Sequence, residues 1–259
     1  MAILNSPVIL STFLMEPNRR NGKGPTLLVS EWIEYIAEAG YRSVEIWAPH
    51  ILLTTRSEWE AIREKSLEFE LPIASILVQI PTDASQKSHK YRESIIEATT
   101  YFECLDIRFT LPTTGTLKEK QEVVGHWAQD LSRECHLIRS FDTWPEKNEM
   151  NAWRDVLEGR FRVSVNPLAF AVDKWEPLFQ DAGDDLVNIG LQPPEDIIPQ
   201  PIKKMEHLRK LIVCLRDMNF RGSWTLDSTG VGVKGESVDD LFDAAEEDLN
   251  FLVGALAKK

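Results

Sequence analysis

Eight short runs of apolar and β-prone residues recur along the chain, each followed by a longer stretch of mixed polarity. Short runs that are apolar on both faces are typical of parallel strands buried inside an α/β protein. The runs cover residues 8–13, 43–47, 73–79, 105–111, 136–143, 161–166, 186–191 and 222–228. We therefore predict eight buried strands.

The stretches between these runs carry apolar residues at helical spacing. Residues 28–39 form one such pattern, which ends at Gly40, a residue that readily takes the left-handed conformation found just past helix ends. Capping-box patterns at Ser57 and Thr116 mark two further helix starts, and Ser237 caps the last helix. The other helices are predicted near residues 91–102, 149–157, 175–179, 202–218 and 239–256. Strands and helices therefore alternate along the whole chain.

This alternation predicts an α/β fold, a single (β/α)₈ TIM barrel. Eight strand–helix units in 259 residues match the usual size of such a barrel. A doubly wound open sheet is the alternative, but no glycine-rich phosphate turn follows the first strand. Neither a linker nor a shift in composition divides the sequence, so residues 1–259 are predicted to be one domain.

Composition narrows the possible partners. The net charge of -12, with no basic patch to offset it, argues against nucleic-acid binding. No apolar run approaches the roughly 20 residues needed to span a bilayer, and the N-terminus lacks the features of a signal peptide. The three widely spaced cysteines are interpreted as buried free thiols. We expect a cytoplasmic protein without membrane partners.

A carboxylate and a large aromatic residue stand at the end of the second predicted strand. In parallel β/α proteins the carboxyl ends of the strands carry the chemistry. Glu45 is therefore a candidate base or hydroxyl ligand, the alternative being a salt bridge to Arg42 or a loop lysine. His50 follows in a predicted loop, where it either hydrogen-bonds a sugar hydroxyl or faces solvent.

Three tryptophans lie in or just beyond predicted strands, namely Trp47, Trp144 and Trp224. Aromatic faces stack on the apolar face of a sugar ring, and the indole edge donates a hydrogen bond. A carbohydrate-sized pocket is the functional interpretation. Trp224 sits earlier in its strand than the others, and packing in the barrel or under a helix is its alternative.

Four segments resemble the xylose-isomerase-like barrels, a group that contains sugar isomerases, sugar-phosphate epimerases, inosose dehydratases and AP endonucleases. The segments are AEAGYRSVEIW at 37–47, VSVNPLAF at 163–170, LVNIGL at 186–191 and GSWTLDS at 222–228. The resemblance implies one divalent cation, usually manganese, magnesium or zinc. Its ligands would be a carboxylate after strand five, Asp-Pro-x-His at strand six, a histidine at strand seven and a glutamate at strand eight.

The sequence departs from that implied ligand set. Asn166 and Ala169 stand where the aspartate and histidine of strand six are expected, and Asn188 stands in place of the strand-seven histidine. Asp227 replaces the strand-eight glutamate, and Asp142 is the nearest carboxylate at strand five. A weak magnesium or manganese site built on Asp142 and Asp227 is conceivable, because hard cations accept carboxylate and amide oxygens. Zinc would need nitrogen or sulfur ligands that are missing here.

Without a metal, Asp142 and Asp227 need other partners, because buried carboxylates must be neutralised or spread apart. Arg108 and Arg139, on neighbouring strands, are the predicted partners. Such ion pairs would fix the barrel mouth and leave no role for a cation.

Two functions follow. The first is a sugar isomerase or epimerase that acts on a small carbohydrate or polyol, with Glu45, Asp142 and Asp227 as acids and bases. The second is a catalytically degenerate, metal-free barrel that serves as a carbohydrate-binding or regulatory subunit. The predicted substrate contacts are Trp47, His50, Arg108, Trp144, Asn166, Asn188 and Trp224. Self-association into a homo-oligomer, as implied by the resemblance, is expected in either case.

Overall fold

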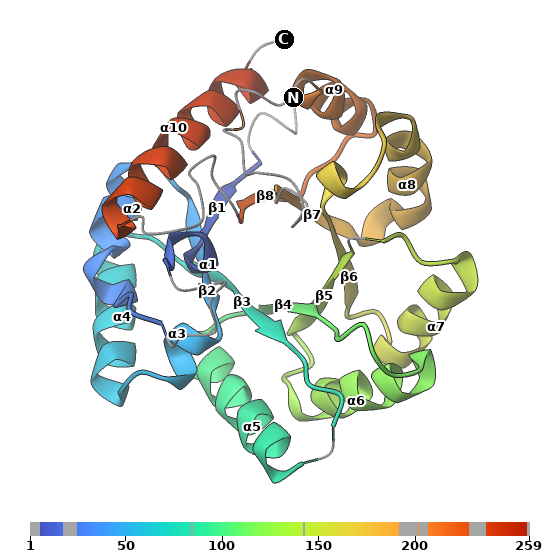
Figure 1. Cartoon of the computed structure of the whole chain (residues 1–259), viewed down its shortest axis with the longest axis horizontal. Helices are drawn as coiled ribbons and strands as arrows, with labels where there is room; N and C mark the ends of the chain where they lie inside the picture. The colour runs from blue at the N-terminus through green and yellow to red at the C-terminus, as the bar shows by residue number, and fades with distance from the viewer. Residues whose placement is uncertain are drawn as a thin grey trace.

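Eight parallel strands close into a barrel in the order in which they occur along the chain (Figure 1). The computed structural model describes residues 6–17, 25–83, 85–141, 143–191, 202, 207–227 and 237–257. The strands are β1 (Val8–Ser11), β2 (Ser43–Trp47), β3 (Ile73–Gln79), β4 (Asp106–Thr110), β5 (His136–Phe141), β6 (Phe161–Val165), β7 (Leu186–Leu191) and β8 (Ser223–Leu226). β8 pairs with β1, so the predicted (β/α)₈ barrel is confirmed and the open-sheet alternative is wrong.

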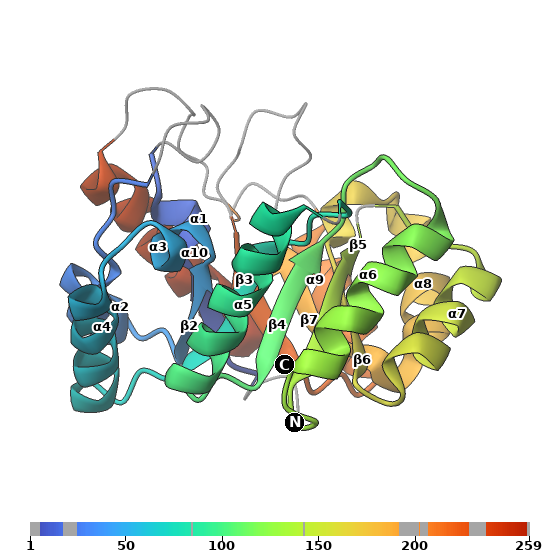
Figure 2. The same cartoon turned by 90° about the horizontal axis from the view of Figure 1, so that it is seen from below.

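Helices form an outer ring around this barrel, and Figure 2 shows α5 and α6 lying along its side. The longer helices are α2 (Ile33–Glu38), α4 (Arg56–Glu68), α5 (Gln86–Tyr101), α6 (Leu117–Asp130), α7 (Lys147–Leu157), α8 (Trp175–Ala182), α9 (Leu208–Asp217) and α10 (Val238–Ala257). Two short helices, α1 (Thr12–Met15) and α3 (Pro49–Leu52), follow the carboxyl ends of β1 and β2. They bring extra side chains to the C-terminal mouth of the barrel.

Element boundaries agree with the sequence where the end signals are local. The Thr116 capping box is present, since Thr116 Oγ1 accepts from Glu119 N at 3.3 Å and Glu119 Oε2 accepts from Thr116 N at 2.7 Å. Ser237 likewise caps α10 by accepting from Asp240 N at 3.1 Å. The Ser57 prediction is wrong, because the N-cap of α4 is Thr55, two residues earlier, and the helix begins at Arg56. The first strand also ends sooner than predicted, because α1 begins at Thr12.

The apolar core lies between the barrel wall and the helices, where Trp127, Trp153 and Phe179 are fully buried. Side chains alternate between the two faces of each strand, so every second residue points into the barrel. On β5, Arg139 points outward and its Nη1 donates to Glu149 Oε1 on α7 at 2.9 Å. The prediction that Arg139 neutralises Asp142 stays a prediction, because Asp142 lies outside the described residues.

The inside of the barrel is polar. Barrel interiors of this fold are usually filled by branched apolar side chains. Here the buried polar residues of the strands and their ends include Glu45, Ser75, Arg108, Ser164, Asn188, Thr225 and Asp227. A buried polar cluster needs mutual hydrogen bonds to persist. The sequence therefore places at the barrel centre groups that must bind one another or a ligand.

None of the helices in the described ranges is long and apolar enough to cross a bilayer. Cys104 and Cys135 are buried free thiols, as predicted, whereas Cys214 is free but only half-buried.

Candidate functional site

A buried arginine bridges two carboxylates at the centre of the barrel. Arg108 Nε donates to Glu45 Oε2 at 2.7 Å, and Nη2 donates to Glu45 Oε1 at 2.5 Å. From the other side, Arg108 Nη1 donates to Asp227 Oδ2 at 3.0 Å, and Nη2 also donates to Asp227 Oδ1. We call Glu45, Arg108 and Asp227 the Arg108 clamp. The predicted ion pair between Arg108 and Asp227 is thus confirmed.

The barrel register explains why residues so distant in sequence meet. Glu45 on β2 is paired with Ser75 on β3, and Ser75 Oγ donates to Glu45 Oε2 at 2.7 Å. Across the barrel, Gly190 on β7 leaves space for the clamp. A Cβ at Gly190 would lie 3.0 Å from Asp227 Oδ2 and 3.5 Å from Arg108 Nη1. The clamp therefore fits because position 190 carries no side chain.

Burial and charge act in opposite directions on the clamp. Burial alone would raise the pKa of Glu45, but the Arg108 charge and the hydrogen bonds from Arg108 and Ser75 outweigh it and lower that pKa. Burial would lower the pKa of Arg108, but Asp227 and Glu45 raise it above its usual range. Glu45 is therefore held ionised, which makes it a weak base. Its predicted surface partners are wrong, because Arg108 is 63 positions away in sequence and buried beside it.

A second polar network lies next to the clamp, on β6, β7 and β8. Asn188 Oδ1 accepts from Ser164 Oγ at 2.7 Å, and Asn188 Nδ2 donates to Ser223 Oγ at 2.8 Å and Thr225 Oγ1 at 2.7 Å. The Asn188 amide is 3% exposed, and its oxygen and nitrogen are both engaged. Asn188 on β7 therefore links β6 and β8 through side-chain hydrogen bonds.

The described residues do not fit the divalent cation that the resemblance implies. Within the described ranges, no group of three or more His, Cys, Asp or Glu side chains is placed to hold a metal ion. Both oxygens of Asp227 accept from Arg108, and Asn188 is engaged in its own network. Asn166 Oδ1 accepts from Leu168 N at 3.2 Å and caps the short helix Pro167–Ala169. The remaining predicted ligand, Asp142, lies outside the described residues.

A third buried cluster, which the sequence did not predict, links α1, α3 and the segment at residues 26–27. His50 Nδ1 lies 2.9 Å from Thr12 Oγ1, and His50 Nε2 lies 3.2 Å from Glu16 Oε2. Glu16 also accepts from Thr26 N at 2.9 Å and from Leu27 N at 3.1 Å. We call these five residues the Glu16 cluster. Its signal in the sequence was Pro49, since proline favours the first turn of a helix and so predicts α3.

The order Thr12–His50–Glu16 resembles a nucleophile, a base and an orienting acid. All three side chains are fully buried, however, and Thr12 Oγ1 accepts a hydrogen bond from Trp47 N at 2.8 Å. A hydroxyl held in this way has no substrate to attack. The cluster therefore fixes the backbone at the end of β2. The interpretation of His50 as a solvent-facing loop residue is wrong, because it is buried in α3.

Acid should weaken this cluster through His50. Burial is the largest influence on the His50 pKa and lowers it, although Glu16 opposes this effect. The folded protein then keeps His50 neutral below pH 6.5, where the unfolded chain binds a proton. We expect the free energy of unfolding to fall between pH 7.5 and 5.5 by up to about 1.4 kcal/mol per pH unit below the unfolded pKa. His50→Gln should flatten this part of the profile in urea denaturation, and an identical slope in both proteins would contradict the assignment.

Two of the three candidate tryptophans are accessible. Trp47 is half-buried and makes edge-to-face contacts with Phe13 and His50, at 5.3 and 5.4 Å between ring centroids. Trp144 is also half-buried, and its Nε1 donates to Asp181 Oδ2 at 2.9 Å. Trp224 is completely buried and lies beside Phe220, on the face of β8 opposite to Thr225. The structure thus favours packing for Trp224. Trp47, in contrast, contacts the Glu16 cluster through its backbone N–H, which donates to Thr12, and through its ring, which packs against His50.

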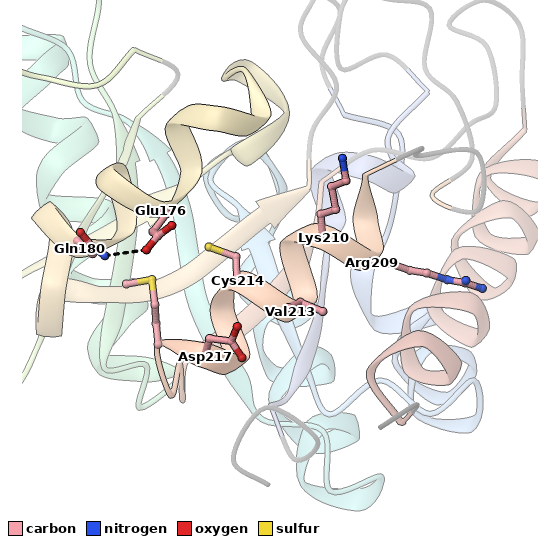
Figure 3. Close-up of a pocket in the computed structure, with 8 residues that line it drawn as sticks. Glu176, Gln180, Arg209, Lys210, Val213, Cys214 and Asp217 are labelled. Carbon is pink, nitrogen blue, oxygen red and sulfur yellow. Dashed lines mark hydrogen bonds between the residues drawn. The ribbon is translucent and has the colours of Figure 1, made fainter.

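Surface grooves on the outer helices do not coincide with the predicted site. One groove of about 500 Å³ lies between α8 and α9 (Figure 3). Its lining includes Arg209, Cys214 and Asp217, together with Glu176 and Gln180, which hydrogen-bond each other at 3.1 Å. None of these residues belongs to the Arg108 clamp or to the Glu16 cluster. This groove is therefore separate from the candidate site.

Comparison with known proteins identifies the fold. No protein-family model matches the sequence, and no curated protein matches it either. Among solved structures, a D-psicose 3-epimerase crystallised with D-fructose superposes with a TM-score of 0.73 at 13% identity, covering 97% of this chain and 100% of the other. The D-psicose 3-epimerase of Clostridium cellulolyticum H10 has a TM-score of 0.70 at 12% identity, covering 96% of this chain and 99% of the other.

A 3-keto-D-glucoside 4-epimerase from E. coli is also similar, with a TM-score of 0.66 at 14% identity over 96% of this chain and 99% of the other. Proteins described as xylose isomerase domain proteins and as a sugar phosphate isomerase/epimerase match in the same way. Identities this low establish the fold alone. The chain therefore has the closed (β/α)₈ barrel fold of the xylose-isomerase-like sugar isomerases and epimerases.

Proposed function

We propose that the protein binds a small carbohydrate or polyol at the C-terminal mouth of the barrel, and that this site works without a divalent metal. Trp47 would form an aromatic wall, and the Arg108 clamp would form the charged floor beneath it. The main observation behind the proposal is the clamp, in which both carboxylates, Glu45 and Asp227, accept hydrogen bonds from the Arg108 guanidinium. Of the two functions expected from the sequence, this arrangement favours the metal-free binding barrel.

Several features support a carbohydrate as the ligand. Similar folds occur in epimerases, two of which act on ketoses or keto sugars by their descriptions. A half-buried indole beside polar groups suits a ligand with one apolar face and several hydroxyls. Asn166 lies directly after β6, and Trp144 lies after β5, so both start near the same end of the barrel. Their contact with a sugar, like self-association and the absence of nucleic-acid binding, stays a prediction.

An isomerase or epimerase is the second candidate, and the fold of the epimerases favours it. Proton abstraction from a sugar carbon needs a carboxylate free to reach that carbon. Glu45 or Asp227 would first have to leave Arg108, while the role of Asp142 as an acid or base stays a prediction. NMR can detect whether deuterium from the solvent enters the sugar. An isomerase or epimerase should incorporate deuterium, whereas a protein that only binds the sugar should not.

Titration with sugars tests the binding proposal. D-fructose and D-tagatose are suitable first probes, with isothermal calorimetry as the measurement. Replacing Trp47 with alanine should weaken binding by about tenfold, because a lost stacking contact is worth roughly 1–1.5 kcal/mol. Trp47→Phe keeps an aromatic face and should retain most of the affinity. Equal affinity in the alanine variant and the native protein would contradict the proposed wall.

A further inference from the structure

The centre of the barrel already holds a permanent cation. Four of the five N–H donors of Arg108 are taken by Glu45 and Asp227. Arg108 is 5% exposed, and its guanidinium is bound by Glu45 on β2 and by Asp227 just after β8, two strands that both pair with β1. Paired hydrogen bonds of this kind are about twice as strong as neutral ones. The position of the Arg108 guanidinium is thus fixed by both carboxylates.

Both carboxylates also meet at a single atom. Glu45 Oε1 and Asp227 Oδ1 each accept from Arg108 Nη2, so the two acids lie on either side of one nitrogen. Two carboxylates this close in a low-dielectric setting cannot both stay ionised without a cation between them. The chain supplies that cation itself.

We propose that the Arg108 guanidinium stands in place of a divalent cation, and that its removal uncovers a cation site formed by Glu45 and Asp227. The positive charge of Arg108 repels a metal, and its N–H groups occupy the oxygens that would bind one. The polar residues nearby reinforce this assignment, because Asn188 and Asn166 use their amide oxygens within the protein. This inference concerns the chain's own charges and does not depend on which sugar, if any, binds above them.

Manganese is the appropriate probe, since bound Mn²⁺ loses the sharp electron paramagnetic resonance signal of the free ion. The native protein, Arg108→Met and the double variant Arg108→Met with Asp227→Asn are titrated with MnCl₂ at physiological ionic strength. Methionine keeps an unbranched side chain of similar length without the charge. The double variant measures weak binding to the acidic surface, which all three proteins share.

The native protein should bind no more Mn²⁺ than the double variant. Arg108→Met should bind one further equivalent of Mn²⁺, at least about tenfold more tightly than the surface of the double variant binds it, because Glu45 and Asp227 then lack the guanidinium that lay between them. A folded Arg108→Met protein with no added binding would overturn the proposal. Tight binding of one equivalent of Mn²⁺ by the native protein would also overturn the proposal. This second test can be made even if the Arg108 variant does not fold.

Discussion

Arg108→Met is expected to lower the free energy of unfolding by about 3–5 kcal/mol, because it leaves two buried carboxylates without their counter-charge. Glu45 is completely buried and Asp227 is 3% exposed, so water cannot replace the lost guanidinium without opening the barrel. Urea denaturation followed by circular dichroism measures the change. The same experiment on Lys118→Met is the control, since Lys118 is exposed and forms a surface ion pair with Glu122 at 3.8 Å.

The control should change stability by no more than about 0.5 kcal/mol. Adding Glu45→Gln and Asp227→Asn to Arg108→Met should restore part of the loss, because both uncompensated charges are then removed. An Arg108→Met protein as stable as the control variant would mean that the clamp contributes nothing to folding. That result would contradict the central position we assign to Arg108.

Glu16→Ala is expected to cost roughly 3 kcal/mol or more, the second-largest effect. Its carboxylate accepts from two backbone N–H groups, those of Thr26 and Leu27, and contacts His50 Nε2 at 3.2 Å. Each buried donor left without an acceptor costs about 1–3 kcal/mol. Thermal and urea unfolding measure the loss, with Glu38→Ala, an exposed residue of α2, as the control.

Glu16→Gln separates charge from hydrogen bonding, because its amide oxygen still accepts from Thr26 N and Leu27 N. We expect this variant to lie between the native protein and the alanine variant. If Glu16→Ala were no more destabilising than Glu38→Ala, the Glu16 cluster would not hold the segment before α2 or the end of β2. Trp47 would then lack the support that the proposed site gives it.

The strands could be predicted because their signals are local. Residues 73–79 and 186–191 are apolar runs whose ends coincide with the observed β3 and β7. Helix caps at Thr116 and Ser237 were also local and were found. The end of the first strand was missed because Thr12 and Phe13 are β-prone by composition, yet they begin α1. Tertiary contacts, here Thr12 with His50, decide such a boundary.

The clamp was only half predicted, for a physical reason. Arg108 was expected to neutralise Asp227 in the absence of a metal, and it does. That Glu45 shares the same guanidinium depends on barrel closure, which places β2 and β8 on either side of β1, so that Arg108 on β4 reaches Glu45 and Asp227 together. The alternation of inward and outward side chains along each strand could have indicated that these residues share the barrel interior. Glu45, Arg108 and Thr225 all occupy inward positions, which could have marked a polar barrel interior before the structure was known.

The inward-facing serine and asparagine residues also indicate a polar barrel interior. Ser164 and Asn188 lie at paired positions of β6 and β7, so a hydrogen bond between them follows from the register. Registers of parallel strands cannot be read from composition, because the strands are joined by long crossovers rather than by tight turns. The sequence could therefore identify individual site residues, but not the contacts between them that depend on strand register.

Sugar binding before and after chelation is the measurement that tests the central claim most directly. The native protein is titrated with a ketose by calorimetry as purified, after treatment with EDTA, and after MnCl₂ is added back. We predict the same affinity in all three conditions, because Arg108 supplies the positive charge of the site. Binding that is lost with EDTA and restored by Mn²⁺ would contradict the account and favour a metal-dependent isomerase.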